Sequence, residues 1–86
     1  MSQNNLHINN KVWFEVLHFS VCVSDDKLAT ALNMLTKKQC NTILLYYFQD
    51  MNDREISELY HVSRSAISSR RNRGLRKLKE LLKERD

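Results

Sequence analysis

The chain has 86 residues, enough for one small domain with a modest hydrophobic core. Its composition is 42% hydrophobic and 28% charged, with no proline and one glycine, which is typical of a globular protein and argues against a β-rich fold of many tight turns. The net charge of +4 is concentrated in residues 64–86, which hold nine Lys or Arg against three acidic residues. This distribution is typical of a protein that binds a polyanion.

The first 24 residues are predicted to form an N-terminal extension. Residues 1–10 lack the charged and apolar regions of a signal peptide, and no run reaches the ~18 apolar residues of a membrane span, so a cytoplasmic protein without a membrane segment is expected. In residues 12–23, VWFEVLHFSVCV, the apolar Val12, Phe14 and Val16 alternate as in a strand, although a helix face can also be drawn. We favour an extended segment or short strand, which must pack on the helices or pair with another chain because a lone strand is unstable.

Residues 25–86 are predicted to form the main domain, an all-α bundle of four helices. Asp25 and Asp26 can cap the first helix, where negative charge is favoured. Thr36 can cap the second helix and form a capping box with Gln39. The second helix should have a core-facing stripe at i, i+3, i+4 and i+7, which consists of Cys40, Ile43, Leu44 and Tyr47.

Residues 52–71, NDREISELYHVSRSAISSRR, predict a helix-turn-helix and are the most direct indication of function. Asn52 and Glu55 form a second capping pair at the start of a short helix. The turn is expected at residues 61–63, where Ser63 caps the last helix.

The last helix is predicted to be long and to reach Glu84. Its first half is rich in Ser and Arg, and its second half is amphipathic. The apolar side consists of Ile67, Leu75, Leu78 and Leu82. Gly74, near the middle, costs about 1 kcal/mol of helix propensity relative to alanine and is expected to let a neighbouring helix approach.

A helix end that enters the major groove of DNA needs short polar or basic side chains on its outward face. The residues that fit this requirement are Ser63, Arg64, Ser65, Ser68 and Ser69. Among them, Arg64 can contact a guanine edge, and the serines can bond to bases or phosphates. Arg54, Arg71 and Arg73 are placed for phosphates, and Asn72 completes the predicted set. Asp53 would oppose DNA unless it is turned away.

The chain resembles region 4 of bacterial RNA polymerase sigma factors between Leu28 and Leu82. The resemblance is carried by LTKKQCNTILLYYFQDMNDREISELYHVSRSAISSRRNRGLRKLKEL, with its EI-x-E-L helix, V-S-R turn and R-x-x-R-x-L-x-K-L tail. It implies recognition of a promoter −35 element by a helix that begins at Ser63. The stretch FEVLHFSVCVSDDKLATAL also resembles small sigma-like proteins of Gram-positive conjugative elements and phages.

The chain departs from the family pattern at three places. It contains no region 2, the part that opens the duplex, so we do not expect it to act alone as a complete sigma factor. His61 occupies a turn position often filled by glycine, where a positive φ would carry strain. Arg70 or Arg71 falls where relatives often place an apolar residue.

The resemblance leaves two regulatory mechanisms and one accessory role open. RNA polymerase core could be held through its β-subunit flap, which the first helices of region 4 cradle in sigma factors, by residues 28–48. Alternatively, a homodimer could form through residues 12–23. A partner is expected because one such module buries too little surface for tight specific binding to double-stranded DNA. The accessory reading keeps the fold but binds RNA polymerase or a sigma factor without DNA readout.

An enzyme is not expected. His7, His18 and His61 are far apart in the sequence, and no serine lies in a glycine-flanked elbow. Cys22 and Cys40 are too few for a zinc site or a disulfide framework, and both are expected as buried free thiols. No catalytic residue, metal ligand or cofactor is therefore assigned.

Overall fold

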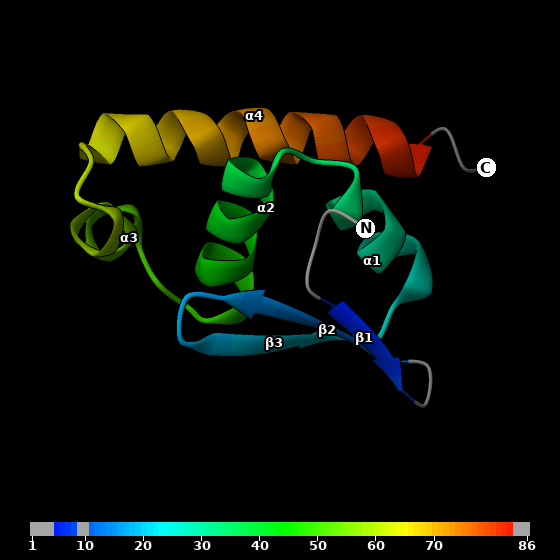
Figure 1. The fold of residues 1–86 in the computed structure, drawn as a ribbon. Coiled ribbons are helices and arrows are strands. Elements are labelled where there is room, and N and C mark those ends of the chain that lie inside the picture. The colour runs from blue at the N-terminus through cyan, green and yellow to red at the C-terminus, as the bar shows by residue number, and fades with distance from the viewer. Residues whose placement is uncertain (1–4, 9–10, 84–86) are drawn as a thin grey trace.

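A computed structural model describes residues 5–8 and 11–83 of the chain, and it arranges them in three layers (Figure 1). The first layer is a sheet of β1 (Asn5–Ile8), β2 (Lys11–Val16) and β3 (Phe19–Val23). The middle layer holds α1 (Asp26–Asn33), α2 (Lys37–Ile43) with its π-helical continuation η1 (Leu44–Phe48), and α3 (Asp53–Tyr60). The third layer is α4 (Arg64–Lys83), which crosses the other helices on the side away from the sheet.

The sheet corrects the expectation of an all-α fold. Its three strands are antiparallel in the order β1-β2-β3, with Val12 opposite Val23 and Val16 opposite Phe19. The four predicted helices are present, but residues 12–23 form a hairpin rather than one extended segment. A two-residue loop of Leu17 and His18 joins its strands, and Leu17 has a φ of 56°. Without glycine, asparagine or proline there, the usual signal of a hairpin turn is missing.

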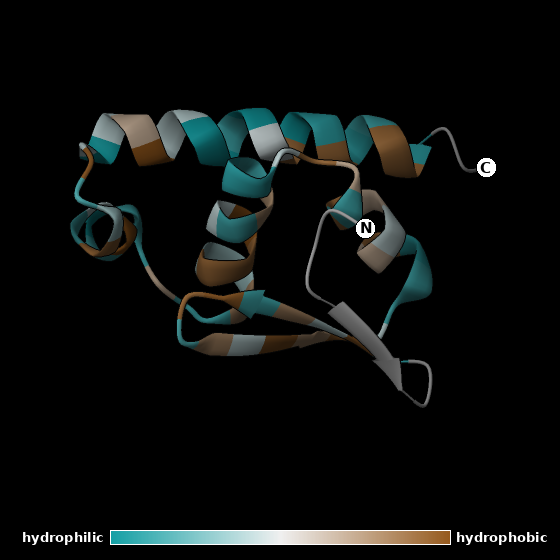
Figure 2. Cartoon of the chain, in the orientation of Figure 1, coloured by the Kyte–Doolittle hydropathy of each residue, from teal (hydrophilic) through white to brown (hydrophobic). Residues whose placement is uncertain are grey.

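The inner face of the hairpin belongs to the same core as the helices. The predicted alternation is present, since β2 buries every second residue. The buried residues of the hairpin are Val12, Phe14, Val16, Val21 and Val23, which join Leu32, Leu44, Ile56 and Ile67 in one hydrophobic cluster. Both strands of the hairpin carry hydrophobic residues, whereas hydrophilic residues predominate along α4 (Figure 2). The strands therefore bury their apolar face within their own chain.

Local side-chain caps start the helices as predicted. Asp25 accepts hydrogen bonds from the backbone N–H groups of Lys27 and Leu28, at 3.0 and 3.2 Å. Thr36 with Gln39, and likewise Asn52 with Glu55, form complete capping boxes. These bonds satisfy N–H groups that a helix leaves without intrahelical partners at its N-terminus.

The predicted core stripe of the second helix is interrupted by the π-helical turn. Cys40, Ile43 and Leu44 are buried as expected, but Tyr47 is 47% exposed and Leu45 is fully buried. A π turn holds more residues than an α turn, so side chains after Leu44 rotate out of the earlier phase. The prediction that Tyr47 faces the core is therefore wrong.

Gly74 allows α4 to lie close to α2. A Cβ atom at this position would be 3.2 Å from Gln39 Cβ and 3.3 Å from Ile43 Cγ1. This contact confirms the predicted close approach of a neighbouring helix. The predicted helix end at Glu84 lies outside the described residues. Within the described part of the chain, no helix combines the length and hydropathy needed to cross a membrane.

Candidate nucleic-acid interface

α3 and α4 form the predicted helix-turn-helix. His61 ends α3 in the left-handed conformation, with φ 59° and ψ 44°, at the position where strain was expected. Val62 donates its N–H to the carbonyl of Ser57 at 3.0 Å, and its side chain packs against the core. Ser63 Oγ accepts the N–H of Ala66 at 3.1 Å and thereby caps α4. Hydrogen bonds to α3 and to α4 thus fix the conformation of the turn.

The first half of α4 presents a polar, uncharged face to solvent. Ser65, Ser69 and Asn72 are exposed and follow an i, i+4, i+7 spacing, so they lie on one side of the helix. Arg73 is exposed next to Asn72, whereas Ser68 is only partly exposed at the edge of this face. Two internal contacts are given for this face: the hydroxyls of Ser63 and Ser65 lie 3.3 Å apart, and Arg71 Nη1 donates to Asn72 Oδ1 at 3.5 Å.

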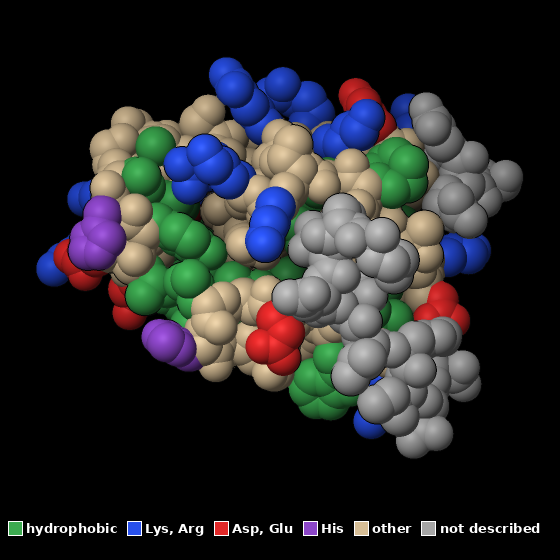
Figure 3. Space-filling model, in the orientation of Figure 1, with side chains coloured by type: hydrophobic (Ala, Val, Ile, Leu, Met, Phe, Trp, Pro, Cys, Tyr) green, Lys and Arg blue, Asp and Glu red, His purple; other side chains and the backbone are tan. Residues whose placement is uncertain are grey.

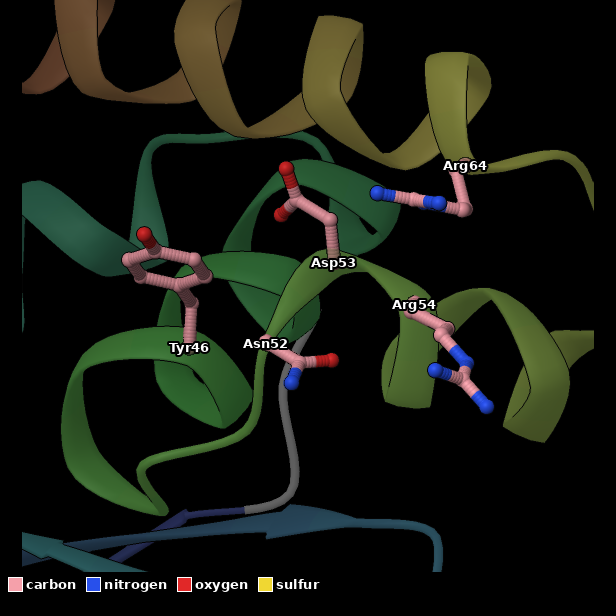
Figure 4. Close-up of a pocket in the computed structure, with 5 residues that line it drawn as sticks. All are labelled: Tyr46, Asn52, Asp53, Arg54 and Arg64. Carbon is pink, nitrogen blue, oxygen red and sulfur yellow. The ribbon is translucent and has the colours of Figure 1, made fainter.

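Arg54 and Arg64 border a hollow at the entrance of the helix-turn-helix. Its volume is about 380 Å³, and Tyr46, Asn52 and Asp53 complete the lining. Figure 4 shows the side chain of Arg64 extending toward Asp53, whereas Arg54 points away from that carboxylate. Arg54 lies 3.5 Å from Glu58 in an exposed ion pair, which contributes little energy and leaves the guanidinium accessible.

Arg71 is placed differently from the other predicted DNA contacts. Its Nε and Nη2 donate to the two carboxylate oxygens of Asp53 at 2.9 and 2.8 Å, and its guanidinium carbon lies 4.3 Å from the centre of the Tyr46 ring. The side chains of Arg71 and Asp53 are only 17% and 21% exposed. Asp53 is accordingly turned away from solvent, and Arg71 binds within the protein instead of facing outward.

Electrostatics support a pair that is charged at neutral pH. The hydrogen bonds from Arg71 lower the pKa of Asp53, and the positive charge of Arg64 acts in the same direction. The sequence contained a signal for this arrangement. Arg71 follows Ile67 by four residues and precedes Leu78 by seven, so it lies on the buried stripe of α4.

The outward side of α4 is strongly cationic along its whole length. Lys and Arg side chains gather over this helix in the space-filling view (Figure 3). The exposed cations of α4 are Arg64, Arg73, Arg76, Lys77, Lys79 and Lys83. A row of this kind suits the phosphate backbone of a nucleic acid.

A second, apolar groove lies between α1, η1 and the second half of α4. Its volume is about 270 Å³, and its lining consists of Leu28, Leu32, Ile43, Tyr47, Phe48, Leu75 and Leu78. Tyr47 and Phe48 are 47% and 38% exposed, so two aromatic rings remain accessible at this groove. The groove was not predicted in this form, because the exposure of Tyr47 follows from the π turn.

Comparison with known proteins is consistent with this geometry. The chain matches the family described as Sigma-70, region 4, over residues 31–80, which include α2, α3 and most of α4. The chain belongs to the sigma-70 region 4 family. This is a family of helix-turn-helix, DNA-binding regulatory domains. The three strands and the first part of α1 precede the matched region.

Similar proteins come from Ureaplasma. A UPF0122 protein of Ureaplasma urealyticum serovar 10 is 54% identical over 35 residues, which are 41% of this chain and 35% of that protein. A UPF0122 protein of Ureaplasma parvum serovar 3 is 51% identical over 35 residues, with the same shares. The match thus spans about a third of the length of these relatives. No solved structure matches the chain significantly.

The two cysteines of this sigma-70 region 4 domain differ in burial. Cys40 is buried, and burial raises the pKa of its thiol to about 12, whereas Cys22 is half-buried on the outer side of β3. Across residues 5–8 and 11–83, no three His, Cys, Asp or Glu side chains lie close enough together to hold a metal ion.

Proposed function

We propose that the protein is a cytoplasmic, sequence-specific transcription regulator that recognises a −35-like promoter element through α4. The observation that supports this most strongly is the exposed face of Ser65, Ser69 and Asn72 directly after a capped helix-turn-helix. Arginine side chains flank the face at Arg64 and Arg73. Short hydrogen-bonding groups between cations are what a helix needs to enter the major groove and reach base edges.

The proposed contacts are of two kinds: some read the base sequence, and others position the protein on the phosphate backbone. Arg64, at the first turn of α4, is proposed to contact a guanine edge, with Ser65, Ser68 and Ser69 bonding to neighbouring bases or phosphates. Arg73 and Arg54 are proposed to bind phosphates, because each guanidinium is exposed, Arg73 at the border of the readout face and Arg54 on α3. Ser63 and Asn72 border the face at its two ends.

RNA polymerase core is the proposed protein partner, held at the apolar groove. Tyr47, Phe48 and Leu75 give this groove a hydrophobic surface that suits an inserted apolar side chain. The groove uses the second half of α4, so a protein bound there leaves the first half free for DNA. The flap of the polymerase β-subunit is the segment that fits this proposal, because family members hold it with the corresponding helices.

Pairing between two copies through residues 12–23 is less favoured by the geometry. β2 is hydrogen-bonded on both sides, to β1 and to β3, so it offers no free edge. A second copy would have to pair along the outer edge of β3, which is five residues long.

Selection of bound sequences from a random DNA pool, with and without RNA polymerase core, tests the proposal. Enrichment of a −35-like hexamer that depends on core is the expected result. A palindrome enriched without core would instead support a dimeric regulator. No enrichment under either condition, together with binding to core, would overturn DNA readout and favour the accessory role.

A matched pair of variants tests the groove in the same assay. Phe48→Ser removes an aromatic ring from the groove and should abolish the enrichment that depends on core. Trp13→Ser removes a ring of nearly equal exposure, 37% against 38%, from the outer side of the sheet and should leave enrichment unchanged. Equal effects of the two substitutions would contradict docking at the groove.

A further inference from the structure

The ion pair of Arg71 adds a polar contact between three elements that also pack on the shared hydrophobic core. Asp53 belongs to the first turn of α3, Arg71 to the middle of α4, and Tyr46 to η1. Tyr46 is in turn held edge-on by Tyr47, with ring centres 4.8 Å apart. We call Asp53, Arg71 and Tyr46 the α3–α4 clamp.

The clamp lies at the far end of the helix-turn-helix from its turn. α3 has eight residues between Asp53 and the turn, and Arg71 is the eighth residue of α4, so each arm is about 12 Å long at 1.5 Å per residue. Ile56 of α3 and Ile67 of α4 share the hydrophobic core, but small changes at His61 can still alter the angle between the two arms. A bond between their far ends closes a triangle, which fixes the angle between the helices.

We propose that Arg71 is a positioning residue that sets the angle of α4 against α3 and thereby directs Arg64 and the serine face toward DNA. This inference rests on the proposed DNA-binding function and extends it to the origin of sequence preference. Base contacts require placement within a fraction of an ångström, whereas phosphate contacts by long, flexible side chains tolerate small rotations. The clamp therefore controls preference for a target sequence more than overall affinity for DNA.

The chemistry of the contact requires arginine at this position. The guanidinium makes two parallel bonds to the carboxylate and presents its flat face to the Tyr46 ring, and an ammonium group cannot do both. The pair also neutralises Asp53, which lines the hollow beside Arg64. Without Arg71, that carboxylate would attract Arg64 more strongly and hold it away from the bases.

The test measures, with RNA polymerase core present, affinity for the selected target and for a scrambled duplex of the same composition. The central variant is Arg71→Lys, which keeps the charge but loses the paired hydrogen bonds to the carboxylate, and its control is the charge-preserving change Lys27→Arg on the exposed surface of α1. Arg64→Ala serves as the reference for loss of a base contact. Thermal unfolding of every variant is followed in parallel, because partial unfolding lowers both affinities by one factor and leaves their ratio unchanged.

We expect Arg71→Lys to lower the ratio of target to scrambled affinity by at least about fivefold, the lower end of the discrimination from one base contact, with scrambled affinity nearly unchanged. Lys27→Arg should change neither value. Arg71→Met, which keeps an apolar stem against Tyr46 but leaves Asp53 uncompensated, should lower the ratio at least as much as Arg71→Lys. Adding Asp53→Asn to Arg71→Met should lower it no further, since both changes break the same bond.

Retention of the full ratio by Arg71→Lys and Arg71→Met would overturn the positioning role while leaving DNA recognition intact. Equal loss of target and scrambled affinity in Arg71→Met would identify Arg71 as a simple phosphate contact and would also overturn it. If the unmodified chain shows no preference for the selected target even with core present, the proposed function fails first, and this inference fails with it.

Discussion

Asp53 is an acidic residue at the border of a cationic surface, and its charge is compensated inside the protein. The carboxylate receives two hydrogen bonds from Arg71 and lies near Arg64, which together lower its pKa. A carboxylate whose pKa is lower in the folded state stabilises the fold at pH values above its unfolded pKa of about 3.9. That contribution is lost as the pH falls through the lower, folded pKa.

Replacement of Asp53 by Asn should therefore change how stability depends on pH. At neutral pH we expect the free energy of unfolding to fall by about 1 kcal/mol, because charge-assisted hydrogen bonds are replaced by a neutral one. Below about pH 4 the unmodified chain should lose stability faster than the variant, so the two curves converge. Thermal unfolding from neutral to strongly acidic pH measures this, with Glu80→Gln on the exposed side of α4 as control. Parallel curves for the two proteins would contradict the role of the pair.

Single residues differ in how far the sequence predicts them. The caps at Asp25, Thr36 and Asn52 depend on neighbours a few residues away, so they could be predicted. Arg71 was taken for a DNA contact because its partner lies 18 residues earlier in the chain, and composition alone favours exposure of an arginine. Its position on the buried stripe of α4 is the sequence feature that indicates an inward-facing side chain.

The crossing of α2 and α4 at Gly74 shows how two elements constrain each other. Alanine there would gain about 1 kcal/mol of helix propensity. Its Cβ, however, would be 3.2 Å from the Cβ of Gln39, an atom that moves only with the backbone of α2. Relief therefore requires the helices to separate, and overpacking of this kind costs about 1–3 kcal/mol.

We expect Gly74→Ala to lower the free energy of unfolding by about 1 kcal/mol, as the difference between these opposing contributions. Urea denaturation measures the change. Asn72→Ala, at an exposed position of the same helix, gains propensity without a clash and should not destabilise the fold. A gain in stability for Gly74→Ala would contradict this expectation and would show that α2 moves away from α4 with little loss of packing energy.

Whole elements were predictable where the signal is local and were missed where it is not. The helix-turn-helix and the four helices follow from caps, spacing and apolar periodicity. The hairpin turn at Leu17 and the π turn at residues 44–48 carry no such signal, because neither contains glycine or proline. Both turns fit the packing of the shared core. At the π turn, this packing buries Leu45 and leaves Tyr47 exposed.

The sheet and the helices form one hydrophobic core across the whole molecule. Phe14 and Val16 of β2 are almost fully buried in the cluster that also contains Leu32 and Ile56. Strands that contribute to a common core should unfold together with the helices. The hairpin is thus part of the cooperative structure that supports the helix-turn-helix.

A mild core substitution, Phe14→Leu, tests whether the sheet and the helices unfold together. It should lower stability by about 1 kcal/mol, and Trp13 fluorescence, which reports on the sheet, should shift its urea midpoint together with the helical circular dichroism signal. Glu15→Gln, on the outer side of the same strand, should leave both midpoints unchanged. Separate midpoints for the two signals would indicate that the sheet unfolds independently.

The π turn gives the chain an unusual way to change its surface. Such a turn is geometrically an α-helix with one residue added, so the side chains that follow it are advanced by about 100°. If residues 44–48 wound as a regular α-helix with the sequence unchanged, Tyr47 would return to the buried stripe of Cys40, Ile43 and Leu44. The winding of this turn, rather than the amino acid at position 47, therefore decides whether the aromatic rings of the groove face a partner. A change from π to α winding would switch that surface while the helix-turn-helix stays intact.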